Sequence, residues 1–133
     1  MAGEWSEVAV SDLADLSGGF AFKSEDYSPS SRFILRTLNI NHDCSISRED
    51  AVYIPEKLCP QYQRFELQAG DTLFVMVGAT LGKVGYVREK DLPALLNQNM
   101  WLIRAKRGLS DSRFVHYACR HAVKASLGWA SGS

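Results

Sequence analysis

A glycine-rich stretch near the middle of the chain has the residue types of a turn that contacts phosphate. It reads Gly78-Ala79-Thr80-Leu81-Gly82-Lys83-Val84-Gly85. Glycine permits a positive φ or the close approach of another backbone. Thr80 can donate a hydrogen bond to a phosphate oxygen, and Lys83 can pair with one as a point charge. The stretch therefore predicts a phosphate-contacting turn formed by Gly78, Thr80, Gly82 and Lys83.

A nucleotide-binding P-loop is the first alternative for this stretch. That motif has four residues between its glycines, continues with Lys and then Ser or Thr, and opens a helix. Here three residues separate Gly78 from Gly82, and Val84 stands where a hydroxyl would hold magnesium. The following Val84-Gly85-Tyr86-Val87 is typical of a strand. The pattern argues against nucleotide binding, while a glycine-rich hairpin without any ligand stays open as a second alternative.

Several other polar residues have side chains that can contact DNA. Arginine pairs bidentately with guanine, and asparagine or glutamine pairs with adenine. The candidates are Arg36, Asn39, Asn97, Gln98 and Asn99, and Lys23 completes the set of possible DNA contacts. The alternative is that these residues end strands and satisfy the hydrogen bonds of turns. The sequence favours neither interpretation over the other.

Signals of catalysis and of metal binding are missing from the sequence. There is no Gly-x-Ser-x-Gly elbow, no Gly-x-Gly-x-x-Gly cofactor turn and no motif for binding S-adenosylmethionine. His42-x-Cys44 and His116-x-x-Cys119 lack the paired Cys-x-x-Cys of a zinc site, and Cys59 lies beside a proline. We therefore expect a protein that is not an enzyme and that holds neither a metal nor a cofactor.

The composition is typical of one folded domain. The chain has 133 residues, of which 46% are hydrophobic, and this suffices for a core. No segment has the roughly 18 apolar residues of a membrane span, and the first residues do not form a secretory signal. The three cysteines are an odd number at wide spacing, which favours reduced thiols. We predict a single domain over residues 1–133 in the cytoplasm.

Charge is unevenly distributed along this neutral chain. Residues 1–31 carry a net charge of −5 and residues 104–133 a net charge of +5. Such polarity can orient a protein on a polyanion, although short windows also vary by chance. Within the basic part, Arg113, His116, Arg120 and Lys124 recur on one side of a predicted helix. They either follow DNA phosphates or form a solvated outer face, which is the commoner case.

Hydrophobic patterning predicts an α+β fold, with a mixed, mostly antiparallel β-sheet core, a glycine-rich hairpin and a C-terminal helix. A helical turn is expected at Leu13 and Ala14, capped by Ser11 and broken at Ser17-Gly18-Gly19. The helix is expected to begin after Ser110 or Asp111, to bury Phe114, Val115, Ala118, Cys119 and Ala122, and to end at Leu127-Gly128. The expected strands are Ser6–Val10, Arg32–Ile40, Val52–Ile54, Thr72–Val77, Gly82–Val87 and Asn97–Arg104.

The order of motifs resembles a target-recognition domain of type I restriction–modification specificity subunits. Leu67-Gln68-Ala69-Gly70-Asp71-Thr72-Leu73-Phe74 is similar to the family's turn and strand, Gly78 to Gly85 to its hairpin, and Leu96-Asn97-Gln98-Asn99 to the strand start that follows. Weaker similarities come in the family's order, at Trp5 to Leu13, Ser17 to Phe22, Leu35 to Ile40 and Asp111 to Tyr117. The resemblance spans about residues 5–127.

The resemblance implies a module that binds double-stranded DNA and does no chemistry. A specificity subunit carries two such domains separated by long helices, and each domain reads one half of a split site. The subunit docks a DNA methyltransferase (modification) subunit and a restriction subunit. This chain departs from that plan because it ends near residues 128–133, where the long spacer helix normally follows, so a homodimer is a possible way to cover a whole site.

Three other interpretations stay open at this point. The chain could be a truncated, mobile-element-encoded specificity fragment that binds partner proteins and not DNA. It could be a small enzyme with a pocket near Lys83. It could also be a remnant that folds but binds nothing.

Overall fold

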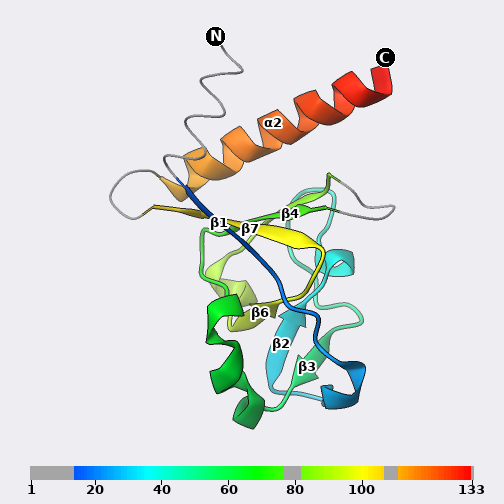
Figure 1. Cartoon of the computed structure of the whole chain (residues 1–133), viewed down its shortest axis with the longest axis vertical. Coiled ribbons are helices and arrows are strands. Elements are labelled where there is room, and N and C mark those ends of the chain that lie inside the picture. The colour runs from blue at the N-terminus through cyan, green and yellow to red at the C-terminus, as the bar shows by residue number, and fades with distance from the viewer. Residues whose placement is uncertain (1–13, 77–81, 107–110, 133) are drawn as a thin grey trace.

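The computed structural model describes residues 14–76, 82–106 and 111–132, and it describes side chains as far as residue 122. Two β-sheets form its centre (Figure 1). The first sheet has the strand order β1-β7-β4-β5, with every neighbouring pair antiparallel. Its strands are β1 (Ala14–Gly18), β4 (Thr72–Val75), β5 (Val84–Tyr86) and β7 (Met100–Ala105).

The second sheet has the strand order β3-β2-β6. Its strands are β2 (Arg32–Leu35), β3 (Val52–Ile54) and β6 (Ala94–Leu96). β2 is antiparallel to β3 and parallel to β6. Four short 3-10 segments connect the strands: η1 (Ser24–Asp26), η2 (Thr37–Asn39), η3 (Glu56–Phe65) and η4 (Glu89–Asp91).

The main hydrophobic core lies between the two sheets. Alternate residues of β4 and β7 point toward the second sheet, because successive side chains of a strand face opposite ways. Leu73 and Met100 from the first sheet meet Phe33 and Leu96 from the second, and all four are fully buried. This core fixes how the ends of the strands of both sheets are placed.

Helix α2 (Ser112–Gly132) covers the other face of the first sheet. Asp111 caps the helix, because its carboxylate accepts hydrogen bonds from the backbone N–H of Arg113 at 2.7 Å and of Phe114 at 3.4 Å. Val115 and Cys119 are buried against Ala14 and Ile103. In the described part of the chain, no helix is both long enough and apolar enough to cross a bilayer.

The α+β class and the mostly antiparallel sheet are confirmed. The strand at Val52–Ile54, the hairpin of β4 and β5, and a strand within 97–104 are confirmed as well, although β7 begins only at Met100. The C-terminal helix is confirmed, with its start after Asp111, but it continues to Gly132 and does not end at Leu127-Gly128. The expected strand at Ser6–Val10 and the cap at Ser11 lie outside the described residues.

Several of the expectations are wrong, among them the burial of Phe114, which is 40% exposed. The strand from Arg32 stops at Leu35, because the chain then turns through η2. Ala14 begins a strand rather than a helical turn, because β1 pairs with β7 along its whole length. His116 is not on the outer face of α2, since its Nδ1 lies 3.1 Å from the Thr72 hydroxyl. In addition, β6 and the helical turns of η3 were not foreseen.

Candidate nucleic-acid interface

The described part of the predicted phosphate-contacting turn, Gly82 and Lys83, lies directly before β5. Gly82 has a φ of +89°, a value that glycine adopts without strain. Its N–H donates to the Val75 carbonyl at 3.0 Å, and the Val75 N–H donates to the Lys83 carbonyl at 2.9 Å. Lys83 is partly exposed at the start of β5. Gly78 and Thr80 lie outside the described residues.

The segment 97–99 lies beside this hairpin. The Met76 N–H donates to the Asn99 carbonyl at 3.0 Å, and Val75 pairs with Met100 in the sheet. Gln98 and Asn99 are exposed, and Asn99 has a φ of +69°. The Asn97 side chain is used locally, because its Oδ1 accepts from the Gln98 N–H at 2.8 Å. The structure therefore brings Lys83, Gln98 and Asn99 to one end of the first sheet.

The turn after β2 reaches the same end of the molecule. β2 and β6 are parallel, with Leu35 opposite Leu96, so Arg36 and Asn97 leave their strands side by side. The Asn97 N–H donates to the Leu35 carbonyl at 3.0 Å. The Arg36 guanidinium donates to the Asp50 carbonyl, while its Nε is buried without a hydrogen-bond partner among the described residues.

Asn39 belongs to this turn but is used inside it. It is fully buried, its Oδ1 accepts from the Arg36 N–H at 2.9 Å, and its Nδ2 donates to the Glu49 carbonyl at 3.3 Å. A side chain in this position offers no free edge to a base. The alternative of a residue that satisfies a turn therefore fits Asn39.

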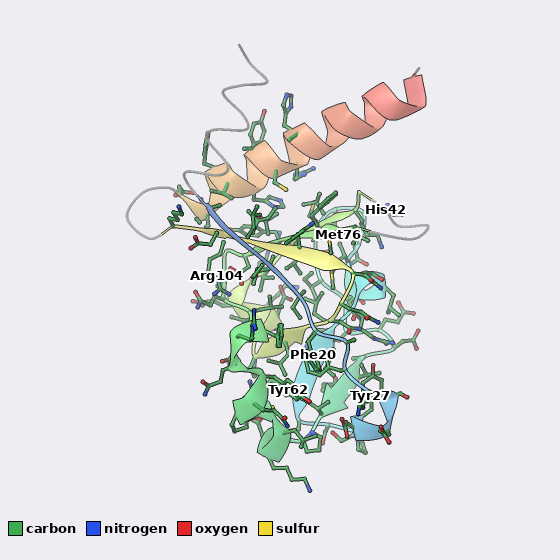
Figure 2. The ribbon with its side chains drawn as sticks, viewed as in Figure 1. Phe20, Tyr27, His42, Tyr62, Met76 and Arg104 are labelled. Atoms are coloured by element: carbon green, nitrogen blue, oxygen red, sulfur yellow. The ribbon has the colours of Figure 1, made fainter. Side chains whose placement is uncertain are left out.

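A turn over residues 41–45, which sequence reasoning missed, lies along the outer edge of β5. The Tyr86 N–H donates to the Cys44 carbonyl at 2.9 Å. A Cβ on Gly85 would lie 3.2 Å from the Ile40 side chain, so the last glycine of the motif leaves room for core packing. His42, in this turn, is exposed, and Figure 2 labels its side chain. The turn-forming residues Asn41 and Asp43 were the available signal.

Comparisons with known proteins support the same family as the motifs. The type I restriction enzyme MjaVIII specificity subunit of Methanocaldococcus jannaschii is 24% identical over 117 residues, which are 86% of this chain and 27% of that subunit. The chain is related to the specificity subunits of type I restriction enzymes. The resemblance drawn from the motifs is thereby confirmed. No protein-family model matches the chain.

Two solved structures share the fold. The HsdS subunit from Thermoanaerobacter tengcongensis matches with a TM-score of 0.58 and 15% identity, over 87% of this chain and 28% of that one. A chain from a structural study of complex assembly and conformational transition of the type I R-M system matches with a TM-score of 0.59 and 14% identity, over 84% and 26%. The chain thus spans about a quarter of the length of its relatives.

In the Gly70-Asp71 turn of the specificity-subunit motif, the Asp71 side chain is buried. The Asp71 side chain is 1% exposed, and its carboxylate accepts hydrogen bonds from the Gln68 N–H and from Nε and Nη2 of Arg104, each at 2.8 Å. The hydrogen bond to Asp71 raises the pKa of Arg104. The Arg104 partner had no signal in the sequence, because it lies 33 residues away. The hydrogen bonds of this motif residue therefore hold the turn.

Lys23 is not brought to the hairpin end. It is exposed directly before η1, and the Ser28 N–H donates to the Tyr53 carbonyl at 2.7 Å, which ties this segment to β3. Lys23 thus lies in a segment that pairs with Asn97 through Phe20 and with β3 through Ser28.

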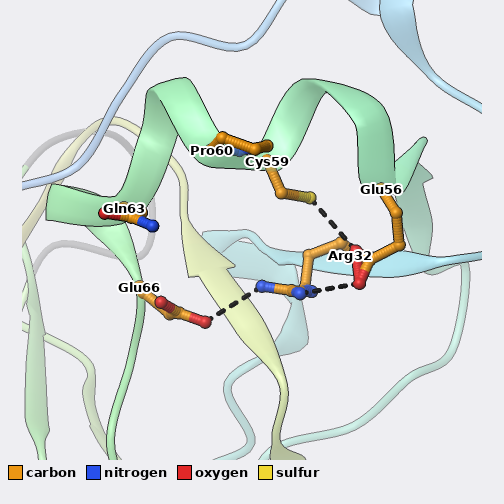
Figure 3. Close-up of a pocket in the computed structure, with 6 residues that line it drawn as sticks. All are labelled: Arg32, Glu56, Cys59, Pro60, Gln63 and Glu66. Carbon is orange, nitrogen blue, oxygen red and sulfur yellow. Dashed lines mark hydrogen bonds and ion pairs between the residues drawn. The ribbon is translucent and has the colours of Figure 1, made fainter.

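A pocket of about 240 Å³ lies between η3 and β2 (Figure 3). Its one cation, Arg32, pairs with Glu56 at 2.8 Å and with Glu66 at 3.0 Å, so it offers no free charge to an anion. Burial, followed by the hydrogen bond to Glu56, raises the pKa of the Cys59 thiol, which keeps it protonated and weakly nucleophilic. The contacts fit a clamp between η3 and β2 rather than a reaction site.

Proposed function

We propose that the chain is a target-recognition domain that binds duplex DNA and reads one half of a bipartite site without catalysing a reaction. The observation that carries the proposal is the meeting of three segments at one end of the molecule. Lys83 at the hairpin, Gln98 and Asn99 before β7, and the Arg36 turn come from separate parts of the chain. The similarity of the chain to a type I specificity subunit supports the same DNA-binding role.

The proposed mechanism divides the contacts between the backbone and the bases of DNA. Lys83 and the backbone N–H groups of the hairpin anchor phosphates, which fixes the position of the protein but carries no sequence information. The exposed amides of Gln98 and Asn99 hydrogen-bond to base edges in the major groove. Arg36 contributes through the part of its guanidinium that the Asp50 carbonyl leaves free. Asn39 supports the turn from inside and touches no base.

The proposal includes partners. A neutral domain of this size covers only half a site, so affinity for a whole site comes from a second copy or from partner subunits. By its relation to specificity subunits, the chain would assemble in the cytoplasm with a methyltransferase subunit and a restriction subunit. The proposed role needs no metal and no cofactor on this chain.

Selection from a random duplex pool tests the proposal. The full chain, alone and together with a type I methyltransferase subunit, is expected to enrich one short sequence motif. Capture of the methyltransferase without enrichment of any sequence would contradict DNA reading and favour a protein-interaction module. Turnover or binding of a nucleotide that Lys83→Ala abolishes would contradict it in favour of a small enzyme.

A further inference from the structure

The outer face of α2 presents a row of exposed polar side chains. Arg113, Tyr117, Arg120 and His121 are spaced four, three and one residues apart, which places them on one side of a helix. All four are exposed, and Tyr117 is 68% exposed. The opposite side of α2 holds Val115 and Cys119 against the sheet. The row therefore faces away from the rest of the described chain.

No carboxylate of the described residues pairs with the charge of this row. No Asp or Glu occurs from Ser112 to the end of the sequence. Among the described residues, neither Arg113 nor Arg120 forms an ion pair, whereas Arg32 and Arg104 are held by carboxylates. Burial, followed by the positive charges of Arg120 and Arg88, lowers the pKa of His116 to about 4. A positive field therefore surrounds this helix in a chain of zero net charge.

The hydrogen-bonding chemistry of the row is complementary to phosphate. Guanidinium groups only donate, and the Tyr117 hydroxyl and a ring N–H of His121 can donate as well. Phosphodiester oxygens only accept. The rings of Tyr117 and His121 stack with an interplanar angle of 11° and a centroid distance of 6.4 Å, which aligns both toward solvent. The row holds no aliphatic side chain, although the buried centre of a protein interface is usually apolar.

We propose that the outer face of α2 binds the phosphate backbone of duplex DNA, as a sequence-independent anchor separate from the hairpin end. The inference rests on the proposed DNA-binding function. Arg113 and Arg120 lie about 10.5 Å apart along the helix axis, at about 1.5 Å per residue. A duplex carries one phosphate charge per ~1.7 Å of its axis, so the two guanidinium groups meet different phosphates of one duplex.

The test removes the two charges from the full chain with Arg113→Gln/Arg120→Gln. Glutamine is a good helix former, and both sites are exposed, so the fold should be kept. We expect the slope of log affinity against log salt to fall by about two, and the affinity at low salt to fall roughly tenfold for every sequence. The preferred sequence should not change, because phosphate contacts do not discriminate bases.

A matched variant, Lys57→Gln/Arg64→Gln, removes the same charge from η3, and it should leave the slope close to that of the wild type. Arg113→Lys/Arg120→Lys should retain the slope, because the charges remain. If Arg113→Gln/Arg120→Gln has the same salt slope as the η3 control, the inference is overturned. This holds even if the variant no longer captures the methyltransferase subunit. If the wild type selects no DNA at all, the proposed function fails and this inference fails with it.

Discussion

The two ends of β4 are turns of opposite character, although both belong to the motifs that identify the family. At the start of the strand, Asp71 is buried and accepts three hydrogen bonds from within the chain. At its far end, Lys83 is partly exposed and Gln98 fully exposed. The polar side chains of the first turn are satisfied internally, and those of the second are left for solvent or a ligand.

The difference teaches how to divide a family motif into residues that hold the strand and residues that can bind. Polar groups satisfied inside the fold gain nothing from DNA, whereas exposed ones do not lose protein hydrogen bonds when DNA arrives. By this criterion Asn39 and Asp71 hold the structure. Gln98, Asn99 and Lys83 are the residues to test for binding.

Loss of the buried carboxylate should have the largest effect. We expect Asp71→Asn to lower the free energy of unfolding by about 3 kcal/mol, because Arg104 loses its counter-charge and the new amide turns a donor toward it. Urea unfolding measures this change. Glu25→Gln, at an exposed carboxylate, should stay within about 0.5 kcal/mol of the wild type. A loss no larger than that control would mean that the ion pair does not hold the turn.

Substitution of the two glycines with positive φ should also lower the free energy of unfolding more at the first turn than at the hairpin. Gly70 has a φ of +95°, and a Cβ there would lie 2.9 Å from Ser112, at the closed end. Gly82 has a φ of +89° at the hairpin. Because an L side chain is strained at such φ values, we expect losses of about 2 kcal/mol for Gly70→Ala and about 1 kcal/mol for Gly82→Ala. Equal losses in thermal unfolding would argue against a packed first turn.

The sequence predicted the fold best where local pattern and pairing agree. The apolar run of β4, the glycines of its hairpin and the apolar stripe of α2 each predicted the element that the structure shows. The strand from Arg32 was predicted too long, because the hydrogen bond from the Arg36 N–H to Asn39 that turns the chain is invisible in alternation. β6 was not predicted, because it is a short, fully buried strand whose sequence shows no alternation.

The candidate site was predicted as a set of residue types, and the structure divides that set by burial. Gln98 and Asn39 are both side-chain amides within expected strands, yet one is exposed and the other is fully buried. Only tertiary packing separates them. Lys23 likewise could not be placed, because its position depends on the contact between Ser28 and β3.

At the open end, Gln98→Ala should change which sequence is bound. We expect the affinity for the preferred sequence to fall about tenfold and that for unrelated sequences to change little, because a base-edge contact contributes about 1–3 kcal/mol of discrimination. Selection from a random pool compares the two proteins. Gln61→Ala, at an exposed amide on η3, should select the wild-type sequence. The same preferred sequence in both variants would remove Gln98 from the base-reading set.

At the closed end, His116 should make stability depend on pH. It packs against Thr72 and Tyr86, and burial, followed by the charges of Arg120 and Arg88, lowers its pKa from 6.5 to about 4. The folded state thus resists protonation, so this stability is present above about pH 6.5 and lost as the pH falls toward 4. Since the ring is partly exposed, solvent screening reduces the effect, and we expect a loss of about 1 kcal/mol between pH 7 and 5. His116→Gln should lose this dependence, and His121→Gln, which changes an exposed histidine, should keep it.

The smallest effect is expected at Lys83, and it separates the two ends of β4 most directly. Because a lysine binds phosphate as a point charge, Lys83→Ala should weaken DNA binding about threefold for every sequence and lower the salt slope by about one. Its unfolding free energy should match that of the wild type, unlike that of Asp71→Asn. Lys57→Ala, on η3, provides the matched loss of one exposed charge. A loss of affinity confined to the preferred sequence would mean that Lys83 contacts a base. A loss of unfolding free energy would mean that Lys83 stabilises the fold, as Asp71 does.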